Sequence, residues 1–250
     1  MSKVILLTGA SRGIGLSIAH FLLQQSHKLT LVARSEPALR ELEKQYPNQT
    51  AILPGDFSDL SLGQKAVDLT IKQFGKLDGV IVNHGVLDPV TKVADAKAEE
   101  WRDGFTINFF SAVAIAKAAI PHLRESKGTI VFTSSGASTT SYQTWGAYGS
   151  SKAAMNHLAA SIANEEKDIT SISVRPGVVD TEMQRDIREK HNTVMTDTDR
   201  AMFKGFKEDG KLLKPEQPGN VMARLVLDAP KDLTGKFVTW NGPELKAFQD

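Results

Sequence analysis

The chain of 250 residues contains no cysteine. Disulfide bonds, thiolate catalysis and sulfur-ligated zinc are therefore all excluded. An excess of one charge is also lacking: the formal net charge is +1, so nothing predicts binding to nucleic acid or to an acidic membrane. We expect no membrane span either, because no apolar run approaches the roughly 20 residues that one requires. No His-Glu-x-x-His motif occurs, and we expect no metal site.

The N-terminus holds only a short apolar run, from Val4 to Leu7, before polar and glycine residues. A secretory signal peptide needs a longer apolar stretch and a cleavage site of small residues, so we expect a cytoplasmic protein. Hydrophobic residues make up 41% of the chain and charged residues 24%, which is typical of a globular protein with a substantial core. The length suits one large domain, so residues 1–250 are predicted to form a single unit.

Apolar segments of strand length alternate with helical segments along the chain. Several are nearly continuous in hydrophobicity, which predicts strands buried on both faces, as in a parallel sheet. The candidate strands begin at Val4, Leu29, Thr50, Gly79, Thr129, Ile169 and Gly235. The candidate helices cover residues 15–25, 37–45, 60–74, 99–124 and 145–166. This alternation predicts an α/β fold, a doubly wound Rossmann-type domain with a mainly parallel seven-stranded sheet flanked by helices.

The segment from 183 to 214 is weakly patterned and rich in mixed charge. It also carries several large apolar side chains, namely Met195, Met202, Phe203 and Phe206. Two interpretations stay open for it. It is either a surface insertion that buries a few side chains or a mobile helical lid over a substrate pocket.

The stretch TGASRGIG, from Thr8 to Gly15, follows the first candidate strand and opens the first helix. Gly9 permits a tight turn, and Gly13 and Gly15 allow the backbone to approach a ligand and the helix to approach the sheet. The helix N-terminus then offers unpaired N–H groups and a positive dipole end to a pyrophosphate. A P-loop would continue with lysine, whereas Leu16 follows here, so the turn predicts a dinucleotide site.

The second candidate strand is followed by Arg34 and Ser35 rather than by the acid that usually holds the ribose of NAD. Arg12 lies in the glycine turn. Two guanidinium groups and a hydroxyl suit the 2′-phosphate of NADP(H), which accepts bidentate hydrogen bonds. The alternative is that both arginines are solvated surface residues.

Six motifs occur in one order along the chain. They are TGASRGIG at 8–15, VNHG at 82–85, Asn108 in TINFFSA, Ser135 in FTSSGAS, YGSSK at 148–152 and RPGVVDT at 175–181. As an ordered set they resemble the short-chain dehydrogenase/reductase family over essentially the whole chain. Within that family, stretches such as NFFSAV and WGAYGSSKAAMNH are similar to the fungal benzil reductases and the related sepiapterin-reductase-like branch.

Tyr148 and Lys152 are one helical turn apart, so both side chains can project from one face. A nearby ammonium and the positive charge of an oxidised nicotinamide favour the phenolate, so the pKa of Tyr148 is predicted to fall below 10. The resemblance implies four catalytic residues. Tyr148 would protonate a carbonyl oxygen, Lys152 would also hold the nicotinamide ribose, Asn108 would help anchor a water and proton relay to Lys152, and Ser135 would donate to the substrate oxygen. Ser134 is the competing candidate for this last role.

The resemblance also implies further contacts with the cofactor. Asp56 would bind the adenine amino group, although it could instead cap the next helix or form a turn. Backbone at Val179 and the hydroxyl of Thr181 would meet the nicotinamide carboxamide. The predicted cofactor-binding residues are Gly9, Ser11, Arg12, Gly13, Ile14, Gly15, Arg34, Ser35, Asp56, Phe57, Asn83, His84, Gly85, Tyr148, Lys152, Pro176, Gly177, Val179 and Thr181.

One position departs from the family pattern. The usual Asn-Asn-Ala-Gly motif is replaced by Val82, Asn83, His84 and Gly85. His84 is larger than alanine and could touch the adenosine ribose, but the tyrosine already supplies proton transfer. We interpret His84 as a steric variant and not as a catalytic base.

The expected activity is an NADPH-dependent carbonyl reductase acting on an apolar ketone or diketone of the benzil kind. Aromatic residues near the catalytic helix, Tyr142 and Trp145, and the Met/Phe segment favour such a substrate. The alternatives are a pterin-carbonyl reductase, a 3-oxoacyl-thioester reductase and a catalytically silent NADP(H)-sensing protein, which would not need the Tyr148–Lys152 pair. A basic entrance for a thioester could come from Lys204, Lys207, Lys211 and Lys214. The resemblance further implies a homodimer or homotetramer.

Overall fold

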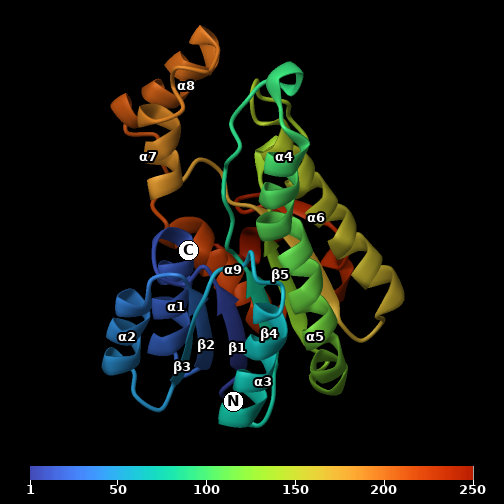
Figure 1. Cartoon of the computed structure of the whole chain (residues 1–250). Coiled ribbons are helices and arrows are strands. Elements are labelled where there is room, and N and C mark those ends of the chain that lie inside the picture. The colour runs from blue at the N-terminus through green and yellow to red at the C-terminus, as the bar shows by residue number, and fades with distance from the viewer. Residues whose placement is uncertain (250) are drawn as a thin grey trace.

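The computed structural model describes residues 1–249 and shows one parallel sheet with helices on both faces (Figure 1). Neighbouring strands are hydrogen-bonded in the order β3-β2-β1-β4-β5-β6-β7, and each of these pairings is parallel. The strands are β1 (Val4–Thr8), β2 (Lys28–Ala33), β3 (Thr50–Pro54), β4 (Gly79–Val82), β5 (Thr129–Thr133), β6 (Thr170–Arg175) and β7 (Phe237–Thr239). The predicted doubly wound fold with seven strands is confirmed.

Helices cover the sheet in two layers, because each crossover between parallel strands carries a helix. The helices are α1 (Gly13–Gln24), α2 (Glu36–Gln45), α3 (Leu62–Phe74), α4 (Ala98–Phe105), α5 (Ser111–Ser126), α6 (Gly146–Glu165), α7 (Glu182–Glu189), α8 (Asp197–Glu208) and α9 (Glu216–Asp228). Short 3₁₀ turns cover Val93–Asp95, Gly136–Ser138, Lys231–Leu233 and Pro243–Phe248. The sheet order reverses between β1 and β4, which is where an open α/β sheet binds ligands.

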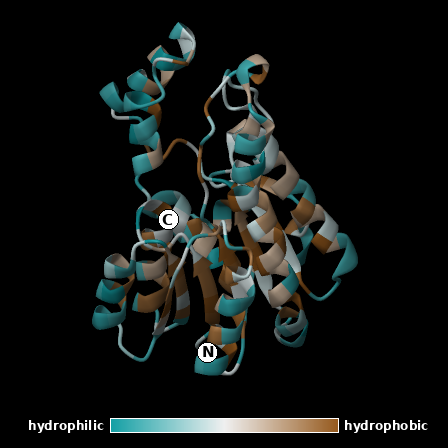
Figure 2. Cartoon of the chain, viewed as in Figure 1, coloured by the Kyte–Doolittle hydropathy of each residue, from teal (hydrophilic) through white to brown (hydrophobic). Residues whose placement is uncertain are grey.

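The core is divided between the two faces of the sheet. Successive strand residues point to opposite faces. Accordingly Ile5 and Leu7 of β1 belong to the core formed with α1 and α9, whereas Leu6 belongs to the core formed with α3, α5 and α6. Figure 2 shows the resulting pattern, with brown, hydrophobic strands in the interior and helices that carry both hydrophobic and hydrophilic residues. Burial on both faces explains why the strand sequences are continuously apolar.

The single helix expected over residues 99–124 is divided by a π-helical turn. α4 ends at Phe105, the π turn covers Thr106–Phe110, and α5 begins at Ser111. The continuous helical run from Ala98 to Ser126 is long and apolar enough to cross a membrane by length and composition, with 44% of its most apolar window buried inside the protein. The expectation that no segment reaches this threshold was therefore wrong. The buried face packs with α3 in the core, which accounts for its apolar composition.

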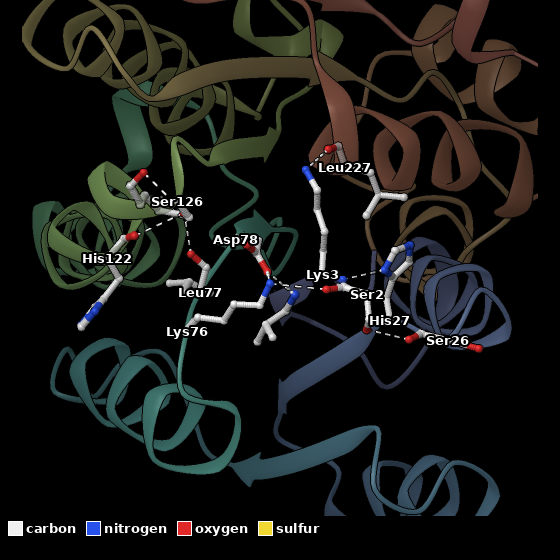
Figure 3. A network of polar contacts seen from close by, with 12 residues as sticks. Ser2, Lys3, Ser26, His27, Lys76, Leu77, Asp78, His122, Ser126 and Leu227 are labelled. Atoms are coloured by element: carbon white, nitrogen blue, oxygen red, sulfur yellow. Dashed lines mark hydrogen bonds and ion pairs between the residues drawn. The ribbon is translucent and has the colours of Figure 1, made fainter.

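Polar contacts join the amino ends of several strands (Figure 3). The backbone N–H of Lys3 donates to Nδ1 of His27 at 3.0 Å, and that of Val4 donates to Oδ2 of Asp78 at 2.7 Å. Lys76 forms an ion pair with Asp78 at 2.8 Å. Since these residues precede or open β1, β2 and β4, this amino-end network lies at the opposite end of the sheet from the carboxyl ends of the strands.

The segment from 183 to 214 lies mostly in α7 and α8, which stand beyond the sheet in Figure 1. Two backbone hydrogen bonds bring its ends together: Leu213 N donates to Val178 O at 2.9 Å, and Asp180 N donates to Leu213 O at 2.8 Å. Met195 and Phe203 are buried, whereas Met202 is exposed. The segment does bury some of its apolar side chains, and its mobility as a lid stays a prediction.

Candidate active site

A cleft of about 640 Å³ opens at the carboxyl ends of the strands, at the point where the sheet order reverses. Its walls come from the glycine turn, from the loops after β2, β3, β4, β5 and β6, and from α6, α7 and α8. The structure brings nearly all the predicted site residues to this one cleft. Two of them do not line it, namely Gly15 and Asn108.

The glycine turn shapes the floor of the cleft. Gly9 and Gly13 have φ angles of +66° and +53°, in the left-handed region where a side chain is unfavourable. Gly15 serves helix packing, since a Cβ there would collide with the main-chain oxygen of Gly9 and lie 2.6 Å from Nδ2 of Asn83. The prediction that Gly15 contacts the cofactor is therefore replaced by a packing role.

Both arginines predicted to bind a 2′-phosphate line the cleft and remain more than half exposed. Arg12 forms an ion pair with Glu182, an acid at the start of α7 that the sequence analysis did not consider. Nη1 of Arg34 lies 4.0 Å from Oδ2 of Asp56. Acidic neighbours therefore offset part of the positive charge at this end of the cleft.

Asp56 also forms the turn that the sequence analysis left open as its alternative role. Its Oδ1 accepts a hydrogen bond from the backbone N–H of Ser58 at 2.8 Å. This bond is the main cause that holds the pKa of Asp56 below its usual value, and the charge of Arg34 adds to the effect. The carboxylate nevertheless lines the cleft, so both interpretations are compatible with its position.

His84 is buried and makes polar contacts with both its ring nitrogens. Nδ1 lies 2.7 Å from the hydroxyl of Thr8 at the end of β1, while Nε2 lies 3.0 Å from the carbonyl oxygen of Ile107 and 2.7 Å from the hydroxyl of Ser111. A carbonyl can only accept, so a hydrogen bond to Ile107 O places the proton on Nε2. The π turn that contains Ile107 is thereby fixed to the sheet.

The interpretation of His84 as a purely steric variant was therefore wrong. Its ring lines the cleft and braces the π turn at the same time. Burial lowers the pKa of His84 to about 3, with the charge of Lys152 as a second cause, so the ring is neutral near pH 7. A neutral ring already engaged at both nitrogens is not available as a general base, as the sequence analysis expected.

Asn108 lies in the π turn and is almost fully buried. Its Oδ1 accepts from Val86 N at 2.8 Å, and its Nδ2 donates to Val86 O at 2.9 Å and to the Ser151 hydroxyl at 3.2 Å. A Cβ at Gly85 would lie 3.2 Å from Oδ1 of Asn108 and 3.4 Å from Nζ of Lys152. The side chain of Asn108 thus clamps the loop after β4 beside Lys152, and its part in a water relay stays a prediction.

Tyr148 and Lys152 both lie on the buried face of α6, at the centre of the cleft wall. Nζ of Lys152 is 5.8 Å from the centre of the Tyr148 ring and donates a hydrogen bond to Thr133 O at 2.8 Å. Burial lowers the pKa of Lys152 to about 8, which leaves the amine mostly charged at pH 7.

The predicted direction of the pKa shift of Tyr148 was wrong for the protein chain itself. Burial raises the pKa of Tyr148 above its ordinary value because it disfavours the phenolate, and the hydrogen bond with the Ser135 side chain opposes this only in part. The spacing along the sequence showed that Lys152 lies near Tyr148, but it did not show how deeply Tyr148 is buried. The tyrosine is therefore held as a neutral proton donor.

The structure distinguishes the two candidate serines at the end of β5. The hydroxyl of Ser134 is directed to α6, where it donates to Oδ1 of Asn156 at 2.6 Å. The hydroxyl of Ser135 accepts from Ala137 N at 3.1 Å, and this side chain is near enough to Tyr148 to lower the pKa of the phenol in part. Ser135 keeps its own proton for an acceptor in the cleft, so the geometry favours Ser135 over Ser134.

Aromatic side chains cover the wall of the cleft beyond Tyr148. The Trp145 ring stacks on Phe203 of α8 with 5.2 Å between centroids, and it lies 5.0 Å from Tyr142 and 6.1 Å from Tyr148. All four residues line the cleft. This aromatic wall (Tyr142, Trp145, Tyr148 and Phe203) would favour a flat apolar group next to the proton donor.

The loop after β6 closes the other side of the cleft. Gly177 adopts a φ of +78°, and a Cβ there would meet Leu213 at 2.6 Å. Thr181 caps α7 by accepting a hydrogen bond from Gln184 N at 3.3 Å. Pro176, Gly177, Val179 and Thr181 all line the cleft, and contact of Val179 and Thr181 with a nicotinamide stays a prediction.

The lysines of the proposed basic entrance are mostly paired with acids. Lys207 contacts Asp180 at 3.0 Å, Lys211 contacts Asp209 at 2.7 Å and Lys204 contacts Glu208 at 3.3 Å. The surface of α8 therefore carries mixed charge, which weakens the argument for an anionic thioester substrate.

Comparison with known proteins identifies the family to which this site belongs. The short chain dehydrogenase family model matches residues 3–192. The chain belongs to the short-chain dehydrogenase/reductase family. It is an oxidoreductase of the kind that acts on carbonyl and hydroxyl groups, and this confirms the resemblance drawn from its six motifs.

Individual relatives extend over the whole chain. A benzil reductase ((S)-benzoin forming) of Saccharomyces cerevisiae is 38% identical, with both chains covered fully. The crystal structure of a short chain dehydrogenase/reductase from the same organism is 40% identical, with a TM-score of 0.97 and full coverage of both chains. A Shigella flexneri short chain dehydrogenase structure complexed with NADP is 25% identical, with a TM-score of 0.80, and the match covers 96% of this chain and 97% of the other.

Proposed function

We propose that the protein is an NADPH-dependent carbonyl reductase that reduces an apolar ketone or diketone to a hydroxy product. The observation that carries the proposal is the placement of Ser135, Tyr148 and Lys152 in the same cleft as the glycine turn and the aromatic wall. The similarity to benzil reductases supports the substrate class.

The residues of the cleft suit a dinucleotide phosphate. The left-handed Gly9 and Gly13 clear the floor of the cleft at the start of α1, where a pyrophosphate would meet unpaired N–H groups. Arg12, Arg34 and Ser35 would hold the 2′-phosphate beyond it, and Pro176 to Thr181 would hold the nicotinamide. Once bound, the reduced nicotinamide supplies the hydride.

The protein chain itself supplies the proton that the carbonyl oxygen of the substrate receives. The carbonyl oxygen of the substrate would accept hydrogen bonds from the hydroxyls of Ser135 and Tyr148, which stabilise the negative charge that develops there. Tyr148 then passes its proton to that oxygen. The charged Lys152, anchored on Thr133 O, stabilises the phenolate that remains, which offsets part of the burial that raises the pKa of Tyr148.

Purified protein should oxidise NADPH in the presence of benzil and simple aromatic ketones, followed by the loss of absorbance of the cofactor. A reducible pterin, an acetoacetyl thioester and NADH serve as comparisons in the same assay. Tyr148→Phe should retain NADPH binding and lose at least about 100-fold in kcat, as expected for loss of a general acid. Rapid turnover by this variant would show that the proton comes from elsewhere.

Other outcomes of the assay point to the alternatives. Turnover of the thioester or the pterin in preference to benzil would preserve the enzyme class and change the substrate. Binding of NADPH without turnover of any carbonyl would favour a cofactor-sensing protein. The intact Ser135–Tyr148–Lys152 arrangement supports the enzyme, since a sensor does not require it.

A further inference from the structure

Asn156 follows Lys152 by one helical turn, so Tyr148, Lys152 and Asn156 form a stripe along one face of α6. Each member of this stripe contacts the short segment at the end of β5. Tyr148 lies near the Ser135 side chain, Lys152 donates to Thr133 O at 2.8 Å, and Asn156 accepts from the Ser134 hydroxyl at 2.6 Å. The helix therefore holds three successive residues of the segment that presents Ser135.

The amide nitrogen of Asn156 is connected to Ser135 through the hydroxyl of Ser138. Nδ2 of Asn156 donates to the hydroxyl of Ser138 at 2.9 Å, and this hydroxyl donates to the carbonyl oxygen of Ser135 at 2.6 Å. The single proton of Ser138 is committed to Ser135, so the hydroxyl can only accept from Asn156. This requirement fixes the orientation of the amide, with Oδ1 toward Ser134 and Nδ2 toward Ser138.

The relay fixes the backbone on both sides of the reactive hydroxyl. The preceding residue, Ser134, is held through its side chain, and the carbonyl of Ser135 is held through Ser138. The turn at Gly136–Ser138 then places Ala137 N so that it donates to Oγ of Ser135 at 3.1 Å. Because the Ser135 hydroxyl accepts this bond and its own proton is not used in it, that proton is available to the substrate oxygen or Tyr148.

We propose that Asn156 is a positioning residue, which orients the Ser135 hydroxyl for the substrate carbonyl through Ser134 and Ser138. The inference rests on the proposed carbonyl reduction, and Asn156 itself does not line the cleft. Leucine at this position would keep a similar volume and remove both hydrogen bonds. The segment could then shift by a few tenths of an ångström, which is enough to weaken a hydrogen bond that must form in the transition state.

The test compares Asn156→Leu in the wild-type background and in the Ser135→Ala background. Asn156→Leu alone should lower kcat about tenfold, equivalent to about 1.4 kcal/mol, with an unchanged Kd for NADPH. In the Ser135→Ala background the same substitution should have no further effect on kcat, because residues that act through one group are not additive. Ser138→Ala should reproduce the loss, and His157→Ala, at an exposed site on the same helix, should not.

Equal losses of kcat in both backgrounds, or full activity of Asn156→Leu, would overturn the proposal.

A crystal structure of Asn156→Leu provides a measurement that needs no turnover, since the Ser135 hydroxyl should have moved away from Tyr148. An unmoved hydroxyl would also overturn it. If the wild type reduced no carbonyl, the proposed function would fail, while this structural comparison would still decide the role of Asn156. If Asn156→Leu does not fold, Ser138→Ala replaces it: its kcat is compared alone and in the Ser135→Ala background, and its crystal structure shows whether the Ser135 hydroxyl has moved.

Discussion

The imidazole ring of His84 stacks on the phenyl ring of Phe57, with 3.7 Å between the ring centres and 13° between the planes. Phe57 follows β3 and His84 follows β4, and these two strands are separated in the sheet by β2 and β1. The stack therefore crosses the floor of the cleft above two intervening strands. Together with the contacts of His84 to Thr8 and Ile107, it joins the loop after β3 to the π turn.

Replacement of His84 by alanine should lower the free energy of unfolding by about 2–4 kcal/mol, because it removes a buried ring together with its polar contacts to Thr8, Ile107 and Ser111. Urea unfolding measures this directly. His122→Ala, which removes a half-buried imidazole outside the cleft, serves as the comparison. Equal unfolding midpoints for the wild type and His84→Ala would show that the brace contributes no stability.

Acid should destabilise the wild type more than the His84→Ala variant. The pKa of His84 is about 3 in the folded chain and near 6.5 when unfolded, so its stabilising effect is complete above pH 6.5 and is lost as the pH falls toward 3. Burial likewise lowers the pKa of His27, which adds to the effect in the same direction. Unfolding curves at pH 7 and pH 5 test this, and a pH dependence of equal size in both proteins would contradict it.

Arg34→Ala should reduce the preference for NADPH over NADH. Loss of a guanidinium that contacts a 2′-phosphate is expected to raise the KM for NADPH about tenfold or more, while the KM for NADH stays nearly constant. Steady-state kinetics with both cofactors provide the ratio of kcat/KM. A parallel change for both cofactors would place Arg34 outside the 2′-phosphate site. Arg40→Ala, on the outer face of α2 and away from the cleft, is the matched control.

Phe203→Ala should change substrate preference more than catalysis. Phe203 is the contribution of α8 to the aromatic wall, and its removal takes away apolar contact with a flat substrate. We expect the kcat/KM for benzil to fall about tenfold or more and that for a small aliphatic ketone to change little. Equal losses for both substrates would instead indicate that Phe203 supports the catalytic geometry.

Asp78→Ala should affect stability and leave kinetics unchanged. The carboxylate accepts from Val4 N and pairs with Lys76 in the amino-end network of Figure 3, at the opposite end of the sheet from the cleft. Loss of this acceptor should cost about 1–3 kcal/mol in the free energy of unfolding. The midpoint of thermal unfolding and the KM for NADPH are the two measurements, and a change in KM would contradict the separation of the two ends.

Local and ordered features of the sequence were sufficient to predict the fold and most of the cleft. Buried strands are apolar without interruption, and ligand residues in this kind of sheet follow strand ends, so Arg34 could be predicted from its place after the second strand. The roles of Asp56 and Ser135 came from the family resemblance. Tyr148 and Lys152 could be placed because a helix sets their spacing. These predictions depend on neighbours within a few residues of one another.

The remaining features depend on contacts between distant segments. The residues around Glu182 and Asn156 in the sequence do not indicate that Glu182 contacts Arg12 or that Asn156 contacts Ser134. A signal did exist for Asn156, which is the next polar residue on the helix face of Tyr148 and Lys152. The direction of the Tyr148 pKa shift was missed because the depth of burial is a property of the assembled core. The contact between His84 and Ile107 O in the π turn likewise joins segments that are distant in the sequence.

The segment that carries α7 and α8 leaves and rejoins the domain at adjacent points, since Val178 and Asp180 bond to Leu213. Insertions, deletions or exchanges confined to the part after Thr181 would leave the sheet, the glycine turn, the loop after β6 and the stripe on α6 in place. Phe203 and Met195 lie within this exchangeable stretch, whereas the proton donor lies outside it. Evolution, or a protein engineer, can therefore alter the range of accepted substrates by grafting a new segment here while inheriting the reaction chemistry intact.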